Sequence, residues 1–349
     1  MDRRNITDSI RPKPTFGHSG LEGFSPQQIH HDVLDPHIIG QEEAKKAASL
    51  AVYNHFESDG EYSSVTLMCG PTGSGKTYIW EILQEEMGER IQIFDASTLS
   101  AEGSWKGDYK ISAIIKDAVM SQRSPRPNMI IVLDEWDKCL EQQGGANESY
   151  SATLQNSFLR LFDHQPIYLP ATEHDKESHA IDTNRISIVL LGSFEKLRNA
   201  MTKAEKHIGF GNTTTVTRSS YSEITVDDLI AHTAIRPEVA GRINRIVMLD
   251  PLTKDDMLRI EKMHIDQRSK LLSKTIKIDD SKLSEIADKA LSMELGARYA
   301  KSQIDAIIDD MIYEDPGADE YEYVLLSEEE GYVSYVSRPA FAYEFEQMS

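Results

Sequence analysis

The stretch Val65-Thr-Leu-Met-Cys-Gly-Pro-Thr-Gly-Ser-Gly-Lys-Thr77 decides the fold of this chain. Its first five residues are typical of a buried β-strand, and a helical pattern follows it. The loop between them matches the phosphate-loop pattern, in which glycines permit a tight turn of N–H groups around phosphates at the positive end of a helix dipole. We therefore predict a nucleotide site in which Lys76 contacts the β and γ phosphates and Thr77 holds Mg²⁺. The residues of this loop are Gly70, Pro71, Thr72, Gly73, Ser74, Gly75, Lys76 and Thr77.

A second motif, Met129-Ile-Ile-Val-Leu-Asp134-Glu135, supplies what a phosphate loop alone lacks. It predicts a buried strand that presents two carboxylates at its C-terminal end. Asp134 is predicted to join the Mg²⁺ shell, and Glu135 to polarise the attacking water. Together the two motifs predict an enzyme that hydrolyses ATP with Mg²⁺.

Short apolar runs alternate with longer segments that can carry helices, which predicts an α/β fold with a parallel sheet and helices on both faces. The predicted strands are Val65–Cys69, Ile91–Phe94, Met129–Leu133, Ile186–Leu191 and Ile246–Leu249. Before them, Ser25 is expected to cap a short helix with Pro26 in its first position, and Gln41–Phe56 has helical spacing.

Beyond Asp250-Pro251 the pattern changes to long polar helices with short strands, which predicts a smaller α+β domain. The expected helices and strands are Lys254–Leu272, Thr275–Ile278, Ser281–Ser292, Ala297–Tyr313, Tyr323–Leu326 and Tyr332–Val336. We expect a flexible arm over residues 1–24, a large ATP-binding domain over 25–250 and the small domain over 251–349.

Composition narrows the choice of partners and compartment. The net charge of −20 argues against nucleic acid, because affinity for it rests on Lys and Arg. No apolar run has the length of a membrane span and no signal core follows Met1, so a cytoplasmic protein is expected. The two cysteines, Cys69 and Cys139, lie at the edges of apolar runs and are predicted to be buried free thiols.

Further segments, in a fixed order, carry a family resemblance. They are Ile38-Ile-Gly-Gln-Glu-Glu-Ala-Lys45, Asp95-Ala-Ser-Thr-Leu99, Asp134-Glu-Trp-Asp-Lys138, Ile208-Gly-Phe-Gly211, Arg236-Pro-Glu-Val-Ala-Gly-Arg242 and Leu295-Gly-Ala-Arg298. From Phe24 to the small domain the chain resembles the ClpX family of AAA+ protein unfoldases. The related HslU unfoldases share the first segment but lack the Ile-Gly-Phe segment, so they fit less well.

The resemblance implies roles for residues outside the two nucleotide motifs. Ile38 and Ile39 correspond to the backbone that lines the adenine pocket. Arg242 corresponds to the arginine finger that reaches the γ-phosphate of a neighbouring subunit, with Arg245 as a competing choice. Arg298 corresponds to the sensor arginine for the same subunit's nucleotide, and Ser193 stands at the place of the polar sensor that orients water.

Two loops are implicated by the resemblance, and each has a structural alternative. Trp105, Lys106 and Gly107 correspond to the pore loop that grips substrate, with Lys106 in place of an aliphatic residue; Trp105 could instead pack beneath its loop. Ile208, Gly209 and Phe210 correspond to the segment that docks on a ClpP-like peptidase; these apolar residues could instead anchor their loop to the core.

The sequence departs from the family at two places. Residues 1–24 contain no cysteine, so we do not expect the family's N-terminal zinc domain or its adaptor docking. Before Asp182, the segment Glu173-His-Asp-Lys-Glu-Ser-His179 replaces a basic pore entrance, and its acidic groups should repel the free carboxylate of a degradation tag.

The resulting hypothesis is a Mg²⁺-ATP-driven homo-hexameric ring that threads protein substrates through its pore and delivers them to a ClpP-like peptidase. Two alternatives remain open. One is a free-standing assembly or disassembly factor for a dedicated partner, and the other is a regulatory subunit of another ClpX-like ring.

Overall fold

The computed structural model describes residues 20–100, 109–122, 126–141, 148–169, 179–206, 224–325 and 333–338. The predicted pore loop (105–107), the docking segment (208–210) and residues 173–178 of the entrance segment lie outside these ranges. The chain forms two compact units, and the main division falls between Pro251 and Leu252.

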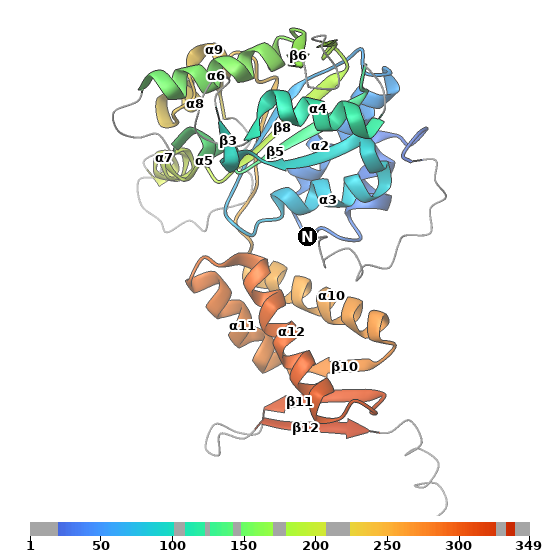
Figure 1. The fold of residues 1–349 in the computed structure, drawn as a ribbon. Helices are drawn as coiled ribbons and strands as arrows, with labels where there is room; N and C mark the ends of the chain where they lie inside the picture. Colours follow the sequence, from blue (N-terminus) through green and yellow to red (C-terminus); the bar gives the residue numbers. More distant parts are fainter. Residues whose placement is uncertain are drawn as a thin grey trace, which may run out of the picture. The chain divides into compact units, whose positions relative to one another are not determined.

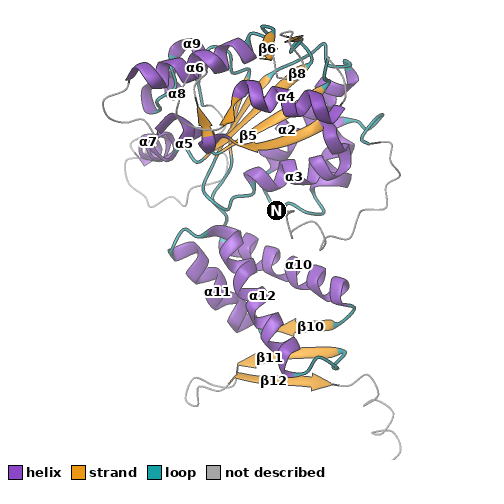
Figure 2. Ribbon diagram, in the orientation of Figure 1, coloured by secondary structure: helices purple, strands orange, loops and turns teal. Residues whose placement is uncertain are grey.

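The first unit is built on a five-stranded parallel sheet, as the sequence predicted. Its strands run in the order β2-β5-β8-β1-β9, and every neighbouring pair is parallel. Figures 1 and 2 show this sheet among its helices. The strands are β1 (Val65–Cys69), β2 (Ile91–Asp95), β5 (Met129–Asp134), β8 (Ile186–Gly192) and β9 (Arg245–Met248).

Each central strand contributes side chains to two separate hydrophobic clusters. In β5, Ile131 and Leu133 belong to one cluster, whereas Ile130 and Val132 belong to the other. The strand is therefore apolar throughout, as expected for a parallel sheet covered on both faces.

The helices that cover the sheet divide between the two clusters. Helices α2 (Glu42–Glu57) and α3 (Lys76–Met87) supply the cluster that contains Val132. Helices α4 (Ile111–Gln122), α5 (Trp136–Glu141) and α6 (Glu148–Phe162) supply the cluster that contains Leu133. The predicted arrangement, with helices on both faces, is confirmed. Helices α7 (Glu195–Lys206), α8 (Val226–His232) and α9 (Pro237–Ala240) also belong to this unit.

The start of the first unit holds one feature that the sequence did not predict. Ser25 caps α1 (Pro26–Gln28) through a capping box, with Pro26 in the first turn, as expected. The next six residues, Ile29–Leu34, form a π-helix, labelled η2. Such helices are rare and occur mostly as single turns.

Short elements complete the first unit. They are η3 (Gly88–Arg90), η4 (Ala96–Thr98), the parallel pair β3 (Leu99–Ser100) and β4 (Tyr109–Lys110), and the antiparallel pair β6 (Ile167–Leu169) and β7 (His179–Ile181).

The second unit is an α+β domain with its own core. A three-stranded sheet in the order β10-β11-β12 carries one parallel and one antiparallel pair. Thr253 caps the first helix with a capping box. The elements are α10 (Lys254–Leu272), β10 (Thr275–Ile278), α11 (Asp280–Ser292), α12 (Gly296–Glu314), β11 (Glu320–Leu325) and β12 (Val333–Arg338).

The cysteines and the hydrophobicity of the helices were both subjects of predictions from composition. Cys69 and Cys139 are both buried and free, as predicted. Burial raises the pKa of the Cys139 thiol to about 12, so this thiol stays protonated at neutral pH. None of the helices within the described residues is long and apolar enough to cross a membrane.

Candidate functional site

The candidate site lies at the carboxyl edge of the parallel sheet. Cys69 at the end of β1 is paired with Gly192 at the end of β8, and Leu133 of β5 is paired with Leu190 of β8. The phosphate loop follows β1, Asp134 ends β5 with Glu135 directly after it, and Ser193 follows β8. The fold therefore brings the three predicted segments to one edge, where open α/β sheets bind ligands.

The phosphate loop passes directly into α3, which begins at Lys76. Gly75 precedes that helix with φ of 99°, a left-handed conformation that favours glycine, and a Cβ added there would meet no atom within 4 Å. The loop can therefore approach a ligand closely with its backbone. The buried hydroxyl Oγ of Ser74 makes no hydrogen bond to the described chain.

Lys76 turns its ammonium back onto the loop. Its Nζ donates to the carbonyl oxygens of Gly70 and Pro71, at 2.8 Å each. Burial lowers the pKa of Lys76, and the nearby Asp134 and Asp137 carboxylates oppose that shift. Within the described residues the hydrogen bonds of this part-buried cation go to two carbonyl groups. Such a cation fits phosphate oxygens, which would take over these hydrogen bonds and add charge pairing.

Thr77 and Asp134 are already in contact across the edge. Thr77 Oγ1 donates to Asp134 Oδ2 at 2.7 Å, while Asp134 Oδ1 accepts from the backbone N–H of Glu135 at 2.8 Å. Mg²⁺ prefers oxygen ligands and keeps several waters, so one hydroxyl and one carboxylate at this spacing fit a nucleotide-bound Mg²⁺.

Glu135 has a different environment from Asp134, its neighbour in sequence. Its φ is +55°, an uncommon value outside glycine, and its side chain is 43% exposed. Oε1 accepts from Lys138 Nζ at 2.6 Å, and this hydrogen bond raises the pKa of the lysine. The carboxylate therefore points outward, and its charge is balanced by a flexible ammonium.

Ser193 is held by a carboxylate that the sequence reasoning did not single out. Asp137 Oδ2 accepts hydrogen bonds from Ser193 N at 2.9 Å, Ser193 Oγ at 2.6 Å and Phe194 N at 3.1 Å. Phe194 has φ of +44°, and a Cβ on Gly192 would lie 2.5 Å from its ring. Ser193, the residue predicted to be the polar sensor, thus donates its hydroxyl proton to Asp137.

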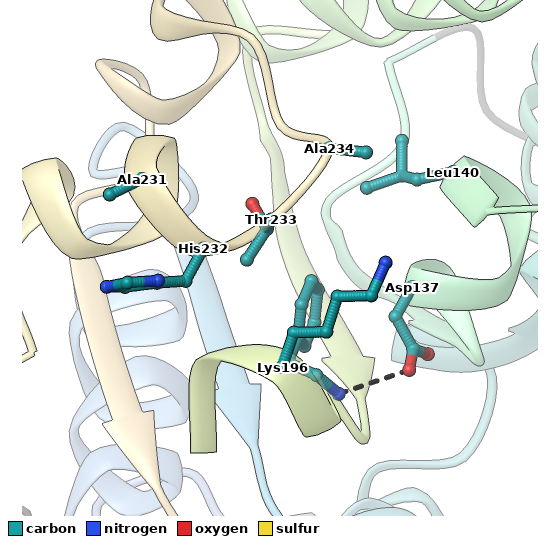
Figure 3. Close-up of a pocket in the computed structure, with 8 residues that line it drawn as sticks. Asp137, Leu140, Lys196, Ala231, His232, Thr233 and Ala234 are labelled. Carbon is teal, nitrogen blue, oxygen red and sulfur yellow. Dashed lines mark hydrogen bonds between the residues drawn. The ribbon is translucent and has the colours of Figure 1, made fainter. Parts of the chain in front are cut away.

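A cavity of about 380 Å³ opens beside this turn. Figure 3 shows Asp137 at its edge, with the hydrogen bond from Phe194 drawn as a dashed line. Its other lining residues are Leu140, Lys196, Ala231, His232, Thr233 and Ala234. Phe194 also lines this cavity, so the turn that carries Ser193 borders open space through its neighbour.

Arg242 follows α9 and is paired with a second acid that the sequence reasoning missed. Its Nε and Nη2 donate to the two carboxylate oxygens of Asp163, at 2.8 and 3.1 Å, and its Nη1 donates to Glu238 O at 2.8 Å. This bidentate hydrogen bond lowers the pKa of Asp163. Arg245 lies three residues on, exposed at the start of β9. Arg242 is partly exposed and Arg245 is exposed, so the choice between them as arginine finger remains a prediction.

The segment predicted to line the adenine pocket leads into α2. Ile38 is buried in the cluster beneath α2 and α3, whereas Ile39 is only partly buried. Gly40 and Gln41 are both left-handed, and the Gln41 amide makes two hydrogen bonds to the backbone of Asp250, at 2.9 and 3.0 Å. These bonds fix the segment to the last residues of the first unit.

Arg298 belongs to the second unit, where it is exposed on the first turn of α12. The structure places Arg298 within the second unit only, so its contact with the nucleotide remains a prediction. Trp105, Lys106, Gly107, Ile208, Gly209 and Phe210 lie outside the described residues.

A signal for one of the missed residues was present in the sequence. Asp137 lies three residues after Asp134, in the first turn of the helix that follows the strand, so an acid there can reach the neighbouring strand end. Asp163 carried no comparable signal, because its contact with Arg242 joins residues 79 positions apart.

Comparisons with known proteins agree with this geometry. Residues 66–212 match the model of the family described as "ATPase family associated with various cellular activities (AAA)". The ATP-dependent Clp protease ATP-binding subunit ClpX of Borrelia duttonii (strain Ly) is 30% identical over 92% of this chain and 81% of its own length. The protein of that name from Treponema denticola is 30% identical over 84% of this chain and 77% of its own length.

Proposed function

Because this chain belongs to the ClpX family of AAA+ ATPases, we propose that it is a Mg²⁺-ATP-driven protein unfoldase or remodeller that works as a homo-hexameric ring. The family assignment makes it an ATP-hydrolysing chaperone subunit. The ring, the threading of substrate and the peptidase partner are the parts that we add.

The nucleotide is held by the phosphate loop and the carboxyl edge of the sheet. Lys76 turns from its two carbonyl partners to the phosphates, and the N-terminal N–H groups of α3 face the same charge. Thr77 and Asp134 are the Mg²⁺ ligands. When bound, Mg²⁺ withdraws charge from the phosphate oxygens. Ile38 and Ile39 border the base.

Glu135 is the residue that orients and polarises the attacking water. Its outward direction supports this role, because the carboxylate is not used by any buried donor of the described chain. Lys138 balances the charge of Glu135 from a flexible side chain, so it can follow or release the carboxylate without disturbing β5.

Hydrolysis is completed between subunits. Arg242 would leave Asp163 and reach the nucleotide of the next subunit, while Arg298 contacts the nucleotide of its own subunit. A guanidinium offers planar paired donors to the charge that develops on phosphoryl oxygens, which supports both roles. This requirement for a neighbour is the reason to propose a closed ring.

Substrate handling is assigned to the two loops that the resemblance implicates. Trp105 would grip an extended polypeptide in the pore, with Lys106 and Gly107 beside it. Ile208 and Phe210, on either side of Gly209, would dock on a ClpP-like peptidase.

One observation carries the proposal: Lys76, Thr77, Asp134 and Glu135 meet at one sheet edge, in a chain that spans about four fifths of a ClpX relative. The test is ATP-dependent unfolding of a folded fluorescent reporter fused to a protein that a Glu135→Gln ring captures from the host. We expect loss of fluorescence with ATP, and less unfolding per ATP hydrolysed in Trp105→Ala.

Two results would change the proposal. If ATP is hydrolysed but no captured protein loses structure, threading is wrong, and an assembly factor is the better description. If unfolding occurs but no ClpP-type peptidase of the host binds, the docking role of Ile208–Phe210 is lost, and the ring acts alone.

A further inference from the structure

Two consecutive histidines on the π-helix η2 point in the same direction. The rings of His30 and His31 are stacked, with centroids 4.6 Å apart and planes inclined by 20°. Consecutive residues of a regular helix do not face each other. Here they do, and one face of η2 therefore carries a pair of imidazoles.

Carboxylates complete the arrangement. His31 Nδ1 lies 2.9 Å from Asp35 Oδ2, and His30 Nε2 lies 3.5 Å from Asp35 Oδ1 and 3.2 Å from Glu42 Oε2. One ligand atom from each of His30, His31 and Asp35 can be chosen so that all lie within 4.8 Å of one another. Around tetrahedral zinc, with bonds of 2.0–2.1 Å, neighbouring ligand atoms are roughly 3.3 Å apart. The contacts of 2.9, 3.2 and 3.5 Å are thus close to that spacing. Glu42 lies outside the three-residue group and contacts it through His30.

Lys45 holds the carboxylates from the other side. Its Nζ pairs with Asp35 Oδ1 and with Glu42 Oε1, the latter at 2.8 Å, and its side chain is only 3% exposed. Asp35 Oδ2 lies beside His31 and Glu42 Oε2 beside His30, while Asp35 Oδ1 is shared between Lys45 and His30. A buried ammonium in this place orients metal-ligating carboxylates from outside the shell.

The charge balance also suits a cation. Two carboxylates and one ammonium leave one negative charge beside the two imidazoles. When the imidazole proton sits on the nitrogen away from the carboxylates, each ring offers a lone pair to the common centre.

We propose that His30, His31 and Asp35 bind one divalent transition-metal ion of the zinc class, and that the 66%-exposed Glu42 side chain turns toward them as a fourth ligand. Imidazole with carboxylate suits Zn²⁺, Ni²⁺ or Cu²⁺, whereas Mg²⁺ prefers oxygen ligands alone. This centre is therefore chemically distinct from the Thr77–Asp134 site.

The ion would link the two ends of the segment Ile38–Gln41, which is predicted to border the nucleotide base. His30, His31 and Asp35 precede Ile38–Gln41, and Glu42 follows it, so coordination ties the two ends of this segment together. Since Gly40 and Gln41 are both left-handed, the segment is a tight turn whose geometry the metal would fix. An effect on ATP affinity rests on the proposed function; the binding of metal does not.

The test is titration of the full-length, nucleotide-free protein with Zn²⁺ against a chromophoric chelator. We expect one tight equivalent and, with Co²⁺ instead, visible bands of tetrahedral coordination. His31 is 61% exposed, so His31→Ala should fold normally; losing a ligand should weaken Zn²⁺ binding by at least about tenfold. His232→Ala, at an exposed histidine that ends α8, is the matched control and should bind as wild type.

Asp35→Asn and Glu42→Gln keep the side-chain shapes and serve as second variants, with circular dichroism to check their folding. The proposal is overturned if wild type shows no tetrahedral Co²⁺ spectrum, or if His31→Ala and Asp35→Asn bind Zn²⁺ as tightly as wild type. If the wild-type protein binds Zn²⁺ as expected but does not hydrolyse ATP, the result would instead count against the proposed function.

Discussion

The ends of β5 and β8 lie next to each other in the sheet, yet they use their polar groups in opposite ways. After β5, Asp134 meets Thr77 and Glu135 points outward to Lys138. After β8, Ser193 and Phe194 donate inward to Asp137. At the end of β5 the carboxylates pair with part-buried or exposed side chains, whereas at the end of β8 the donors are held by a buried carboxylate. We infer from this difference that the end of β5 takes part in the chemistry and that the end of β8 holds the edge in shape.

The largest expected effect is at the end of β5. Glu135→Gln removes the group proposed to polarise water but leaves the phosphate loop intact, so we expect kcat for ATP to fall about 1000-fold. Affinity for ATP, measured by titration of a fluorescent analogue, should change little. Lys76→Ala should lose that affinity. Turnover by Glu135→Gln close to that of wild type would remove the contrast between the two strand ends.

A second prediction concerns whether one chain supplies the whole active site at this sheet edge. Arg242→Ala should lower steady-state ATPase about 100-fold, because an arginine that stabilises transferring phosphate contributes strongly to the rate. In mixtures with Glu135→Gln, some interfaces pair an intact Glu135 with an intact Arg242, and activity should rise above the sum of the two variants. Mixtures that never exceed that sum would place the whole site in one subunit.

The third prediction concerns the end of β8, where the donors of the turn bind Asp137. Asp137→Asn keeps the shape but removes the charge that accepts three hydrogen bonds, so the first unit should lose about 1–3 kcal/mol of stability. The thermal midpoint followed by circular dichroism should fall by several degrees. Asp227→Asn, at an exposed acid on α8, is the control. An unchanged midpoint in Asp137→Asn would mean that this turn does not depend on the carboxylate.

This contrast also shows what the sequence could predict. The phosphate loop and Asp134-Glu135 were predictable because each motif is local and each follows an apolar strand. Their meeting then follows from parallel strands, whose carboxyl ends share one edge. The contact between Thr77 and Asp134 needed no further information.

Other contacts depend on geometry that periodicity does not carry. The link from Asp137 to Ser193 spans 56 positions and requires Gly192 and the left-handed Phe194. The pair of Arg242 and Asp163 requires the packing of α6 against α9. The π-helix that aligns His30 with His31 has no pattern of its own in the sequence. The roles of Trp105 and of Ile208–Phe210 remain predictions.

The smallest expected effect decides what Ser193 does. Its Oγ donates to Asp137 at 2.6 Å, while the backbone N–H groups of Ser193 and Phe194 supply two further bonds to the same oxygen. Ser193→Ala should therefore cost about 1 kcal/mol of stability. Because the turn survives, kcat should stay within about threefold of wild type.

Ser193→Thr is the matched control for this variant, since it keeps a hydroxyl that can donate to Asp137 and should regain most of the lost stability. A sensor that orients water would behave differently. In that case Ser193→Ala would lower kcat by about 100-fold or more, with an unchanged thermal midpoint and unchanged ATP affinity. That result would show that the hydroxyl leaves Asp137 when nucleotide binds, and the end of β8 would then join the end of β5 in the chemistry.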